Sequence, residues 1–245
     1  KASKPATAAI LAAGGVGSRF ASSGQAAPKQ FLSLAGRPMY VWPLLRLAAH
    51  PLIGHVVVVV PQTAVSPVRQ SISELTELPD LCKISVTAGG ATRQESVHYG
   101  LHFLGSAEAP PEMVLIHDGA RPFLTTDLIN AVIAAALEHG ASVPCLAVTD
   151  TIKRVSNGKI METLDRAELF TVQTPQAGRF SDLANAHHQA VSQGWSVTDD
   201  ASILEKCGHG VAVVPGSPYN LKVTQPLDLL LCEALAPTLL KEQAK

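Results

Sequence analysis

A glycine-rich turn followed by two cations is the first feature of this sequence that could do chemistry. The turn at 14–17 (Gly-Gly-Val-Gly) follows an apolar run of strand length, and Arg19 and Lys29 come after it. Glycine lets backbone N–H groups approach phosphate oxygens that a Cβ would obstruct. The pattern fits neither common nucleotide fingerprint, because Phe20 stands where one needs glycine and no Gly-Lys-Ser/Thr follows. We interpret the turn as a triphosphate site, with a plain structural turn as the alternative.

Two further strand-like runs end in residues that could contact a ligand. A Gly-Gly pair at 89–90 follows the run 83–86 and could read a base edge through backbone groups. The run 113–117 leads into Asp118 and Arg121. A carboxylate there could accept from ribose hydroxyls or order a hydrated Mg²⁺, and the guanidinium could hold a phosphate. A local Asp–Arg pair at the surface is the alternative.

The histidines and cysteines do not indicate a metal or redox site. His98 and His102 lie one helical turn apart but have no glutamate between them in HExxH order. We expect His187 and His188 to be surface residues pointing in different directions on a helix. The four cysteines form no CxxC pair, so we expect free thiols in a reducing cytoplasm.

These residues need a scaffold that brings strand ends together, and the apolar pattern predicts one. Strand-length runs alternate with stretches of helical period between 8–13 and 142–147, which is typical of βαβ units. The valines at 56–60 are apolar on both faces, as in a central strand covered by helices. Thr92 and Glu95 form a possible capping box. We predict an α/β fold, a Rossmann-like three-layer sandwich with a mostly parallel sheet.

The segment 149–166 breaks this alternation. It contains Asn157 and Gly158, the strongest short hairpin signal, between two strand-like arms with little apolar surface. A lone hairpin is marginal in water, so we expect it to pack on something else, with a second subunit as the first candidate. The segment is therefore predicted to be a β-hairpin that needs a partner surface.

Length and charge limit the remaining possibilities. A chain of 245 residues that is 47% hydrophobic suits one domain, and we assign 1–245 to it. With 19 basic and 20 acidic residues the net charge is -1, so neither nucleic acid nor an anionic membrane is expected as a partner. No apolar stretch approaches the roughly 20 residues that cross a bilayer, and we expect a cytoplasmic protein.

Nine segments, in order, resemble one known family, the methylerythritol phosphate cytidylyltransferases of the nucleotide-diphospho-sugar transferase fold. The resemblance covers nearly the whole chain. The segments are 12–19, 28–30, 89–90 with Ser96, 117–122, 150–153, 165–166, 174–176, 198–202 and 220–224.

The resemblance implies a role for each site residue. It implies that Arg19 and Lys29 stabilise charge on the α-phosphate of CTP, and that Arg166 and Lys222 position the incoming phosphate substrate. The residues implied to surround CTP are Ala13, Gly14, Gly15, Gly90, Ala91, Ser96, Asp118 and Gly119. Those implied to hold the polyol phosphate are Arg121, Thr151 and Thr174.

The resemblance also implies Mg²⁺ or another divalent cation. It further implies a homodimer in which 149–166 is the protruding β-hairpin dimerisation arm of the family. Asp118 is a possible metal ligand, but the direct ligands stay open and are left mainly to the triphosphate. Before Asn220 the family often has an acid, whereas this chain has Tyr219. The loop between Arg19 and Lys29 is also slightly longer than the family pattern.

The implied reaction transfers CMP from CTP to 2-C-methyl-D-erythritol 4-phosphate, releasing pyrophosphate, in non-mevalonate isoprenoid precursor synthesis. A phosphate monoester, with a second pKa of about 6, is mostly ionised at neutral pH and needs no general base. The alternatives are a ribitol 5-phosphate cytidylyltransferase and a non-catalytic nucleotide-binding protein.

Overall fold

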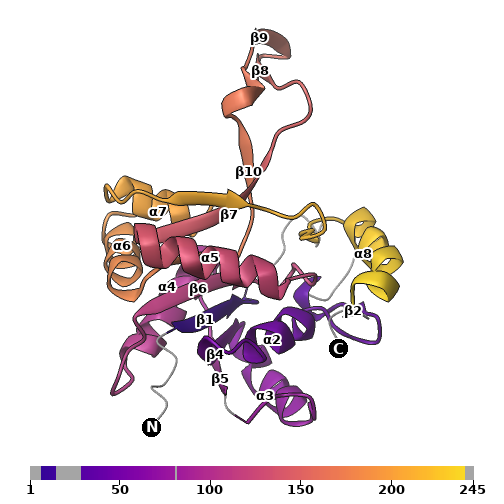
Figure 1. Cartoon of the computed structure of the whole chain (residues 1–245), viewed down its shortest axis with the longest axis vertical. Helices are drawn as coiled ribbons and strands as arrows, with labels where there is room; N and C mark the ends of the chain where they lie inside the picture. The colour runs from indigo at the N-terminus through magenta and orange to yellow at the C-terminus, as the bar shows by residue number, and fades with distance from the viewer. Residues whose placement is uncertain (1–6, 15–28, 81, 241–245) are drawn as a thin grey trace.

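A central sheet with helices on both faces organises the computed structural model, which describes residues 7–14, 29–80 and 82–240 (Figure 1). The described strands are β1 Thr7–Ala12, β2 Ser33–Leu34, β3 Arg37–Pro38, β4 Ile53–Val60, β5 Lys83–Ala88, β6 Met113–Asp118, β7 Ala141–Ala147, β8 Lys153–Ser156, β9 Lys159–Thr163, β10 Phe170–Val172, β11 Gln176–Arg179 and β12 Ala212–Pro215. The described α-helices are α2 Val41–Ala48, α3 Val65–Ser73, α4 Arg93–Gly105, α5 Thr126–His139, α6 Phe180–Ser192, α7 Asp200–Lys206 and α8 Pro226–Leu239. The 3₁₀ helices are η1 Lys29–Phe31, η2 Gln62–Ala64 and η3 Arg166–Glu168.

The main sheet is mostly parallel, as predicted. Its order is β10-β7-β11-β6-β1-β4-β5, and β12 pairs with β7. Strand β1 runs parallel to both β4 and β6, whereas β10 and β11 run antiparallel to their neighbours. Because parallel strands share a direction, the carboxyl ends of β1, β4, β5 and β6 meet at one edge.

Alternate residues of the central strands build two separate cores. Ile10 and Val57 face the helices α4 and α6, while Leu11 and Val58 face α2, α3 and α5. This alternation follows from the two-residue side-chain period of a strand. Every valine at 56–60 is 0% exposed, which confirms that this run is a central strand covered on both sides.

The loops that form the candidate site leave the sheet at neighbouring points. Ala12 is in register with both Val59 and Asp118, and Gly119 N donates to Ala12 O at 2.9 Å. One strand further, Gly89 N donates to the carbonyl oxygen that ends β4, at 2.7 Å. The turns after β1, β5 and β6 are therefore held side by side.

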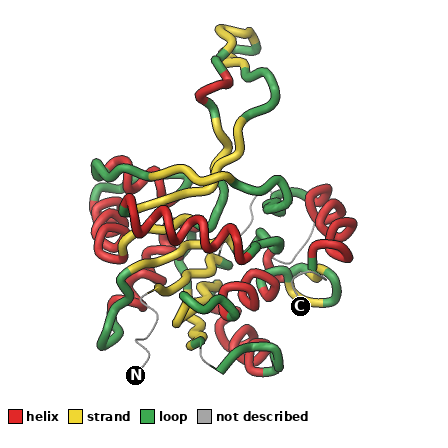
Figure 2. The backbone as a smooth tube through the Cα atoms, viewed as in Figure 1, coloured by secondary structure: helices red, strands yellow, loops and turns green. Residues whose placement is uncertain are grey.

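The β8–β9 hairpin stands away from the rest of the molecule, at the top of Figures 1 and 2. Both turn residues have positive φ, 50° at Asn157 and 73° at Gly158, as the predicted tight turn requires. Every residue of the two strands is exposed. The hairpin itself is confirmed, and its part in dimerisation stays a prediction.

None of the described helices combines the length and apolarity that a membrane span requires.

Candidate active site

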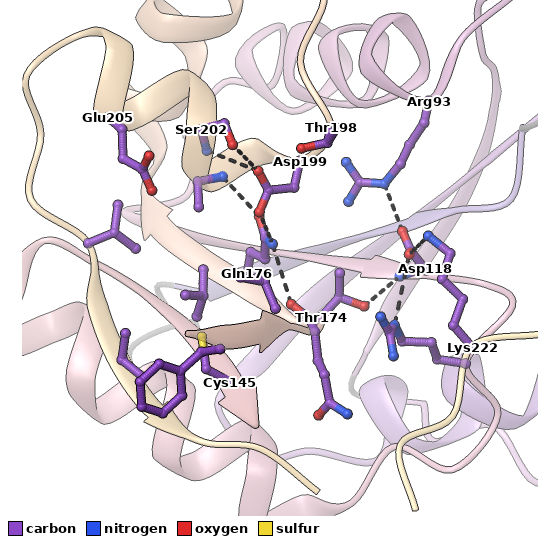
Figure 3. Close-up of a pocket in the computed structure, with 18 of the residues that line it drawn as sticks. Arg93, Asp118, Cys145, Thr174, Gln176, Thr198, Asp199, Ser202, Glu205 and Lys222 are labelled. Carbon is purple, nitrogen blue, oxygen red and sulfur yellow. Dashed lines mark hydrogen bonds and ion pairs between the residues drawn. The ribbon is translucent and has the colours of Figure 1, made fainter. Parts of the chain in front are cut away.

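A cavity of about 540 Å³ opens beside the carboxyl end of β6 (Figure 3). One part of it is lined by Arg93, Asp118, Arg121 and Lys222, with Thr174 next to them. Three further carboxylates, Glu168, Asp199 and Glu205, also line the cavity. These residues are spread over most of the chain and are brought together only by the fold. A pocket with a few convergent charged groups is the usual form of a small-molecule site.

Three cations surround the carboxylate of Asp118, the last residue of β6. Lys222 Nζ lies 2.6 Å from Asp118 Oδ2, and Arg93 Nε lies 2.7 Å from Oδ1. Arg121 Nε is 3.9 Å from Oδ2. Burial raises the pKa of Asp118, but the attraction of Arg93, Lys222 and Arg121 outweighs it and holds the pKa well below its usual value. Asp118 is therefore ionised and gathers positive charge at the cavity, so the alternative of a surface Asp–Arg pair is wrong.

Arg93 connects Asp118 to a second buried carboxylate, Asp200 in the first turn of α7. Arg93 Nη2 lies 2.8 Å from Asp200 Oδ2, and His187 Nε2 lies 3.1 Å from Asp200 Oδ1. Burial lowers the pKa of Arg93, but the two carboxylates raise it above its usual value. Sequence analysis missed Arg93 as a site residue. The available signal was its place directly after Thr92, the cap of a helix that follows a glycine turn.

The prediction that His187 is a surface residue is wrong, because its side chain is 0% exposed. Helix α6 buries Leu183, Ala186 and Ala190, and this spacing places position 187 on the same buried face. His188 is exposed, as expected. The spacing of apolar residues could have revealed that His187 is buried. It could not have revealed that the partner of His187 is Asp200 in α7.

Gly14 and Gly89 both lie close to the side chain of Ser96 in α4. An added Cβ would lie 2.6 Å from Ser96 Oγ at Gly14 and 2.5 Å from it at Gly89. Both positions therefore require glycine for close approach. Ser96 is fully buried and its hydroxyl donates to Thr92 O at 2.8 Å. Its predicted contact with a nucleotide stays a prediction.

Glu95 shapes the turn at 90–92. Its Oε2 accepts from Ala91 N at 2.6 Å and from Thr92 N at 3.2 Å, and the predicted capping box is confirmed. A Cβ at Gly90 would lie 2.4 Å from Glu95 Cβ. The backbone N–H of Ala91 is thus already bonded within the chain, so a ligand contact there would use another atom.

Lys29 is placed close to the first glycine turn by its neighbour. Gln30 Nε2 donates to Ala13 O at 2.6 Å, and Gln30 is buried. Lys29 itself is half-buried in η1. Gln30 therefore holds η1 next to Ala13, and the predicted role of Lys29 at the phosphates of CTP stays a prediction.

Of the predicted site residues that the structure describes, Asp118, Arg121, Thr174 and Lys222 line this cavity, and the others are not among its lining residues. Gly15 and Arg19 lie outside the described residues. Thr151 and Arg166 are exposed residues of the arm segment and are not among the described residues that line the cavity. Arg166 Nη1 donates to Thr149 O at the base of the arm. Arg166 is therefore not among the described residues that line the cavity with Lys222, whereas Glu168, two residues further on, does line it.

A divalent cation finds no ready-made site among the described residues. No group of three or more His, Cys, Asp or Glu side chains there could hold a metal ion. Asp118, the possible ligand, already has Arg93 on one oxygen and Lys222 on the other. The described residues alone therefore do not form a complete Mg²⁺ site. Mg²⁺ commonly takes several of its ligands from substrate phosphates and water.

The far end of the cavity is apolar and was not predicted. Cys145, Phe170, Val172 and Val213 line it, from β7, β10 and β12. The side chains of α7 that include Ser202 border it on another side in Figure 3. The cavity thus extends from the cation cluster toward the strand that leads out of the arm.

Comparisons with known proteins single out one family over nearly the whole chain. The profile described as 2-C-methyl-D-erythritol 4-phosphate cytidylyltransferase matches residues 7–237. The protein of that name from Syntrophus aciditrophicus is 42% identical over 232 residues, covering 94% of this chain and 96% of its own. The one from Syntrophotalea carbinolica is 41% identical over 230 residues, covering 94% and 95%. The crystal structure of the Thermus thermophilus protein of that name aligns with a TM-score of 0.74 at 32% identity, covering 94% of this chain and 98% of that one.

Proposed function

This chain belongs to the 2-C-methyl-D-erythritol 4-phosphate cytidylyltransferase family, and on that premise we propose how its residues perform the reaction of that family. The reaction is transfer of CMP from CTP to 2-C-methyl-D-erythritol 4-phosphate, giving 4-diphosphocytidyl-2-C-methyl-D-erythritol and pyrophosphate, for isoprenoid synthesis. The observation that carries the assignment of the site is the carboxylate of Asp118 with three cations around it at the edge of the cavity.

The polyol phosphate binds at this cation cluster. Lys222 is 35% exposed, so its ammonium can contact Asp118 and a bound phosphate together. Arg121 donates through Nη1 to Asn220 O at 2.7 Å, which fixes the guanidinium next to the cavity. Charged hydrogen bonds of this kind suit phosphate oxygens. The ionised phosphate is the nucleophile, so the site has to position it and needs no general base.

CTP binds across the glycine turns at the adjoining sheet edge. A side chain at Gly14 or Gly89 would meet Ser96, so both positions stay free of side chains and a triphosphate and a base can approach the backbone there. We assign Lys29, and Arg19 outside the described residues, to the charge that builds up on the α-phosphate and the leaving pyrophosphate. Asp118 and Gly119 stand between the two substrates.

Any divalent cation would arrive with the nucleotide. The described residues supply no cluster for it, so its ligands would come mainly from the triphosphate and water. When bound, such an ion neutralises phosphate charge. The steps derived above do not depend on where it sits.

The active enzyme is a homodimer in which the arm of one subunit completes the site of the other. Val155, Ile160 and Met161 are 57%, 64% and 64% exposed on a two-stranded hairpin that cannot bury them itself. Apolar side chains in this position favour a protein partner. This arrangement would also give Arg166 and Thr151 a cavity to line, since neither is among the described residues that line the cavity of their own chain.

Residues 1–245 are proposed to act as one domain, since strands from Thr7 to Pro215 share one sheet. The cytoplasm remains the proposed location, because the four cysteines are free thiols, three of them buried.

Pyrophosphate release from CTP tests the function directly. With CTP and Mg²⁺, we expect release with 2-C-methyl-D-erythritol 4-phosphate and not with ribitol 5-phosphate. Release only with ribitol 5-phosphate would replace the substrate and keep the mechanism. Binding of CTP without release of pyrophosphate in the presence of either polyol phosphate would indicate a non-catalytic nucleotide-binding protein.

A further inference from the structure

His117 is a buried imidazole next to Asp118 to which the proposed reaction gives no role. It lies in β6 and is 0% exposed. Its Nε2 lies 3.1 Å from Arg121 O, and its Nδ1 lies 3.1 Å from Thr174 Oγ1. Arg121 and Thr174 both line the cavity, so one buried ring connects two residues assigned to the polyol phosphate.

The two partners of the ring fix where its hydrogen lies. A carbonyl oxygen can only accept, so Nε2 donates to Arg121 O. Burial lowers the pKa of His117 to about 4, although the carbonyl of Arg121 and the charge of Asp118 act in the opposite direction; the charges of Arg121 and Arg93 reinforce the effect of burial. The ring is therefore neutral at neutral pH, and its Nδ1 has a lone pair and no hydrogen.

This arrangement commits the hydroxyl hydrogen of Thr174. Because Nδ1 can only accept, Thr174 Oγ1 donates to it. Asp118 N donates to the same oxygen at 3.1 Å and uses one of its two lone pairs. A single lone pair remains for a ligand, so Thr174 can accept from a ligand but has no hydrogen to give it.

We propose that His117 is a positioning residue that makes Thr174 a hydrogen-bond acceptor only, so that Thr174 binds a hydroxyl group of the polyol chain and not the phosphate. The inference rests on the proposed function. At neutral pH the oxygens of a phosphate monoester are mostly ionised and act as acceptors, so the lone pair of Thr174 repels them. The donors Lys222 and Arg121 lie in the same cavity and take the phosphate instead. The ring thus helps to orient the substrate and to select a polyol.

Two substitutions of His117 separate its two hydrogen bonds. Asparagine places an amide oxygen near the position of Nδ1 and keeps an acceptor for Thr174. Glutamine reaches the position of Nε2 and keeps the donor to Arg121 O. Both remove the ring, and only His117→Gln frees the Thr174 hydroxyl. Because asparagine is one methylene shorter than glutamine, His117→Asn loses more packing, and lost packing alone would therefore affect His117→Asn more.

The substrates for the test are 2-C-methyl-D-erythritol 4-phosphate and its monodeoxy analogues, each lacking one hydroxyl. We expect wild type to discriminate against one analogue by about 10- to 100-fold in kcat/KM, because that analogue leaves a buried acceptor unpaired. His117→Asn should keep this ratio, whereas His117→Gln should weaken it and Thr174→Val should abolish it. Equal ratios for the two His117 variants, or an unchanged ratio in Thr174→Val, would overturn the proposal.

The ¹⁵N chemical shifts of the ring test the same arrangement without turnover. Between pH 6 and 8 we expect the neutral tautomer with hydrogen on Nε2, assigned by the signals that His117→Asn removes. In Thr174→Val the Nδ1 signal should move. The opposite tautomer or a charged ring would overturn the proposal. Loss of pyrophosphate release in wild type would instead contradict the proposed function, so the two failures can be told apart.

Discussion

Arg93 joins the two buried carboxylates of the site. It bridges Asp118 and Asp200, whose side chains are only 7% and 1% exposed. Removing one partner of a buried ion pair is strongly destabilising, because it leaves a buried charge without compensation. The role of Arg93 is therefore to allow two carboxylates to stay ionised inside the protein.

Substitution Arg93→Met should lower the free energy of unfolding by about 3 kcal/mol. The matched control is Arg154→Met, which breaks the 2.7 Å pair with Glu162 on the exposed arm and should change it by less than about 1 kcal/mol. Urea denaturation measures both. Equal effects of the two substitutions would show that the buried network does not stabilise the fold.

At the residue scale the sequence predicts the members of the site better than their pairing. Asp118 and Arg121 could be identified because they directly follow an apolar run that ends at a sheet edge. Lys222 lies in a loop about a hundred residues later. Its neighbours in the sequence give no sign of a role, and only the resemblance to a family indicated it. Arg93 was missed because its two partners lie 25 and 107 residues away.

The glycine turns act at the scale of whole elements, because they set how closely β1, β5 and α4 approach one another. At Gly89 an added Cβ would meet Ser96 Oγ at 2.5 Å and Val59 Cγ1 at 3.0 Å. Neither atom can move far, since Ser96 and Val59 are both 0% exposed. A side chain at Gly89 therefore has to displace the turn or the helix.

Substitution Gly89→Ala should weaken CTP binding by about tenfold or more and destabilise the protein by about 1–3 kcal/mol through overpacking. Gly210→Ala is the control, because nothing lies within 4 Å of the Cβ that it would add. Calorimetry with CTP and urea denaturation give the two readouts. A Gly89→Ala protein with the affinity and stability of the Gly210→Ala control would contradict the close packing described.

The elements that could be predicted are those with a strong local signal. The valines at 56–60 and the Asn157-Gly158 turn determine a buried strand and a hairpin from a few neighbouring residues. The antiparallel strands β10 and β11 could not be predicted, because they have only three and four residues and no periodic pattern. Their direction depends on the pairing with β6 and β7, which is set by the rest of the sheet.

At the level of the whole molecule, two chains are needed for each complete site. Ile160 is exposed near the tip of the arm, and the neighbouring Lys159 is exposed as well. A charge introduced at Ile160 should prevent apolar contact with a partner. Reversing the charge already present at Lys159 should not prevent it. Ile160→Glu is expected to shift the protein toward monomer and to lower pyrophosphate release, with Lys159→Glu as the control, both measured by sedimentation and turnover.

Mixing two inactive variants tests whether the arm acts on the partner. Arg166→Ala lacks the guanidinium of Arg166 in the arm segment, and Lys222→Met lacks the ammonium of Lys222 at the cavity. If Arg166 serves the partner's cavity, a mixed dimer has one intact site, and random pairing should restore about a quarter of wild-type activity. No recovery in a mixture shown to contain mixed dimers would place Arg166 in the site of its own chain.

If the cations around Asp118 hold the polyol phosphate, Lys222→Met removes one of its contacts. The measurement is pyrophosphate release over a range of both substrates. The account predicts a fall of about 100-fold in kcat/KM for 2-C-methyl-D-erythritol 4-phosphate, as for the loss of one transition-state donor, with the Kd for CTP changed by less than about threefold. A kcat/KM for the polyol phosphate within about threefold of wild type would contradict it.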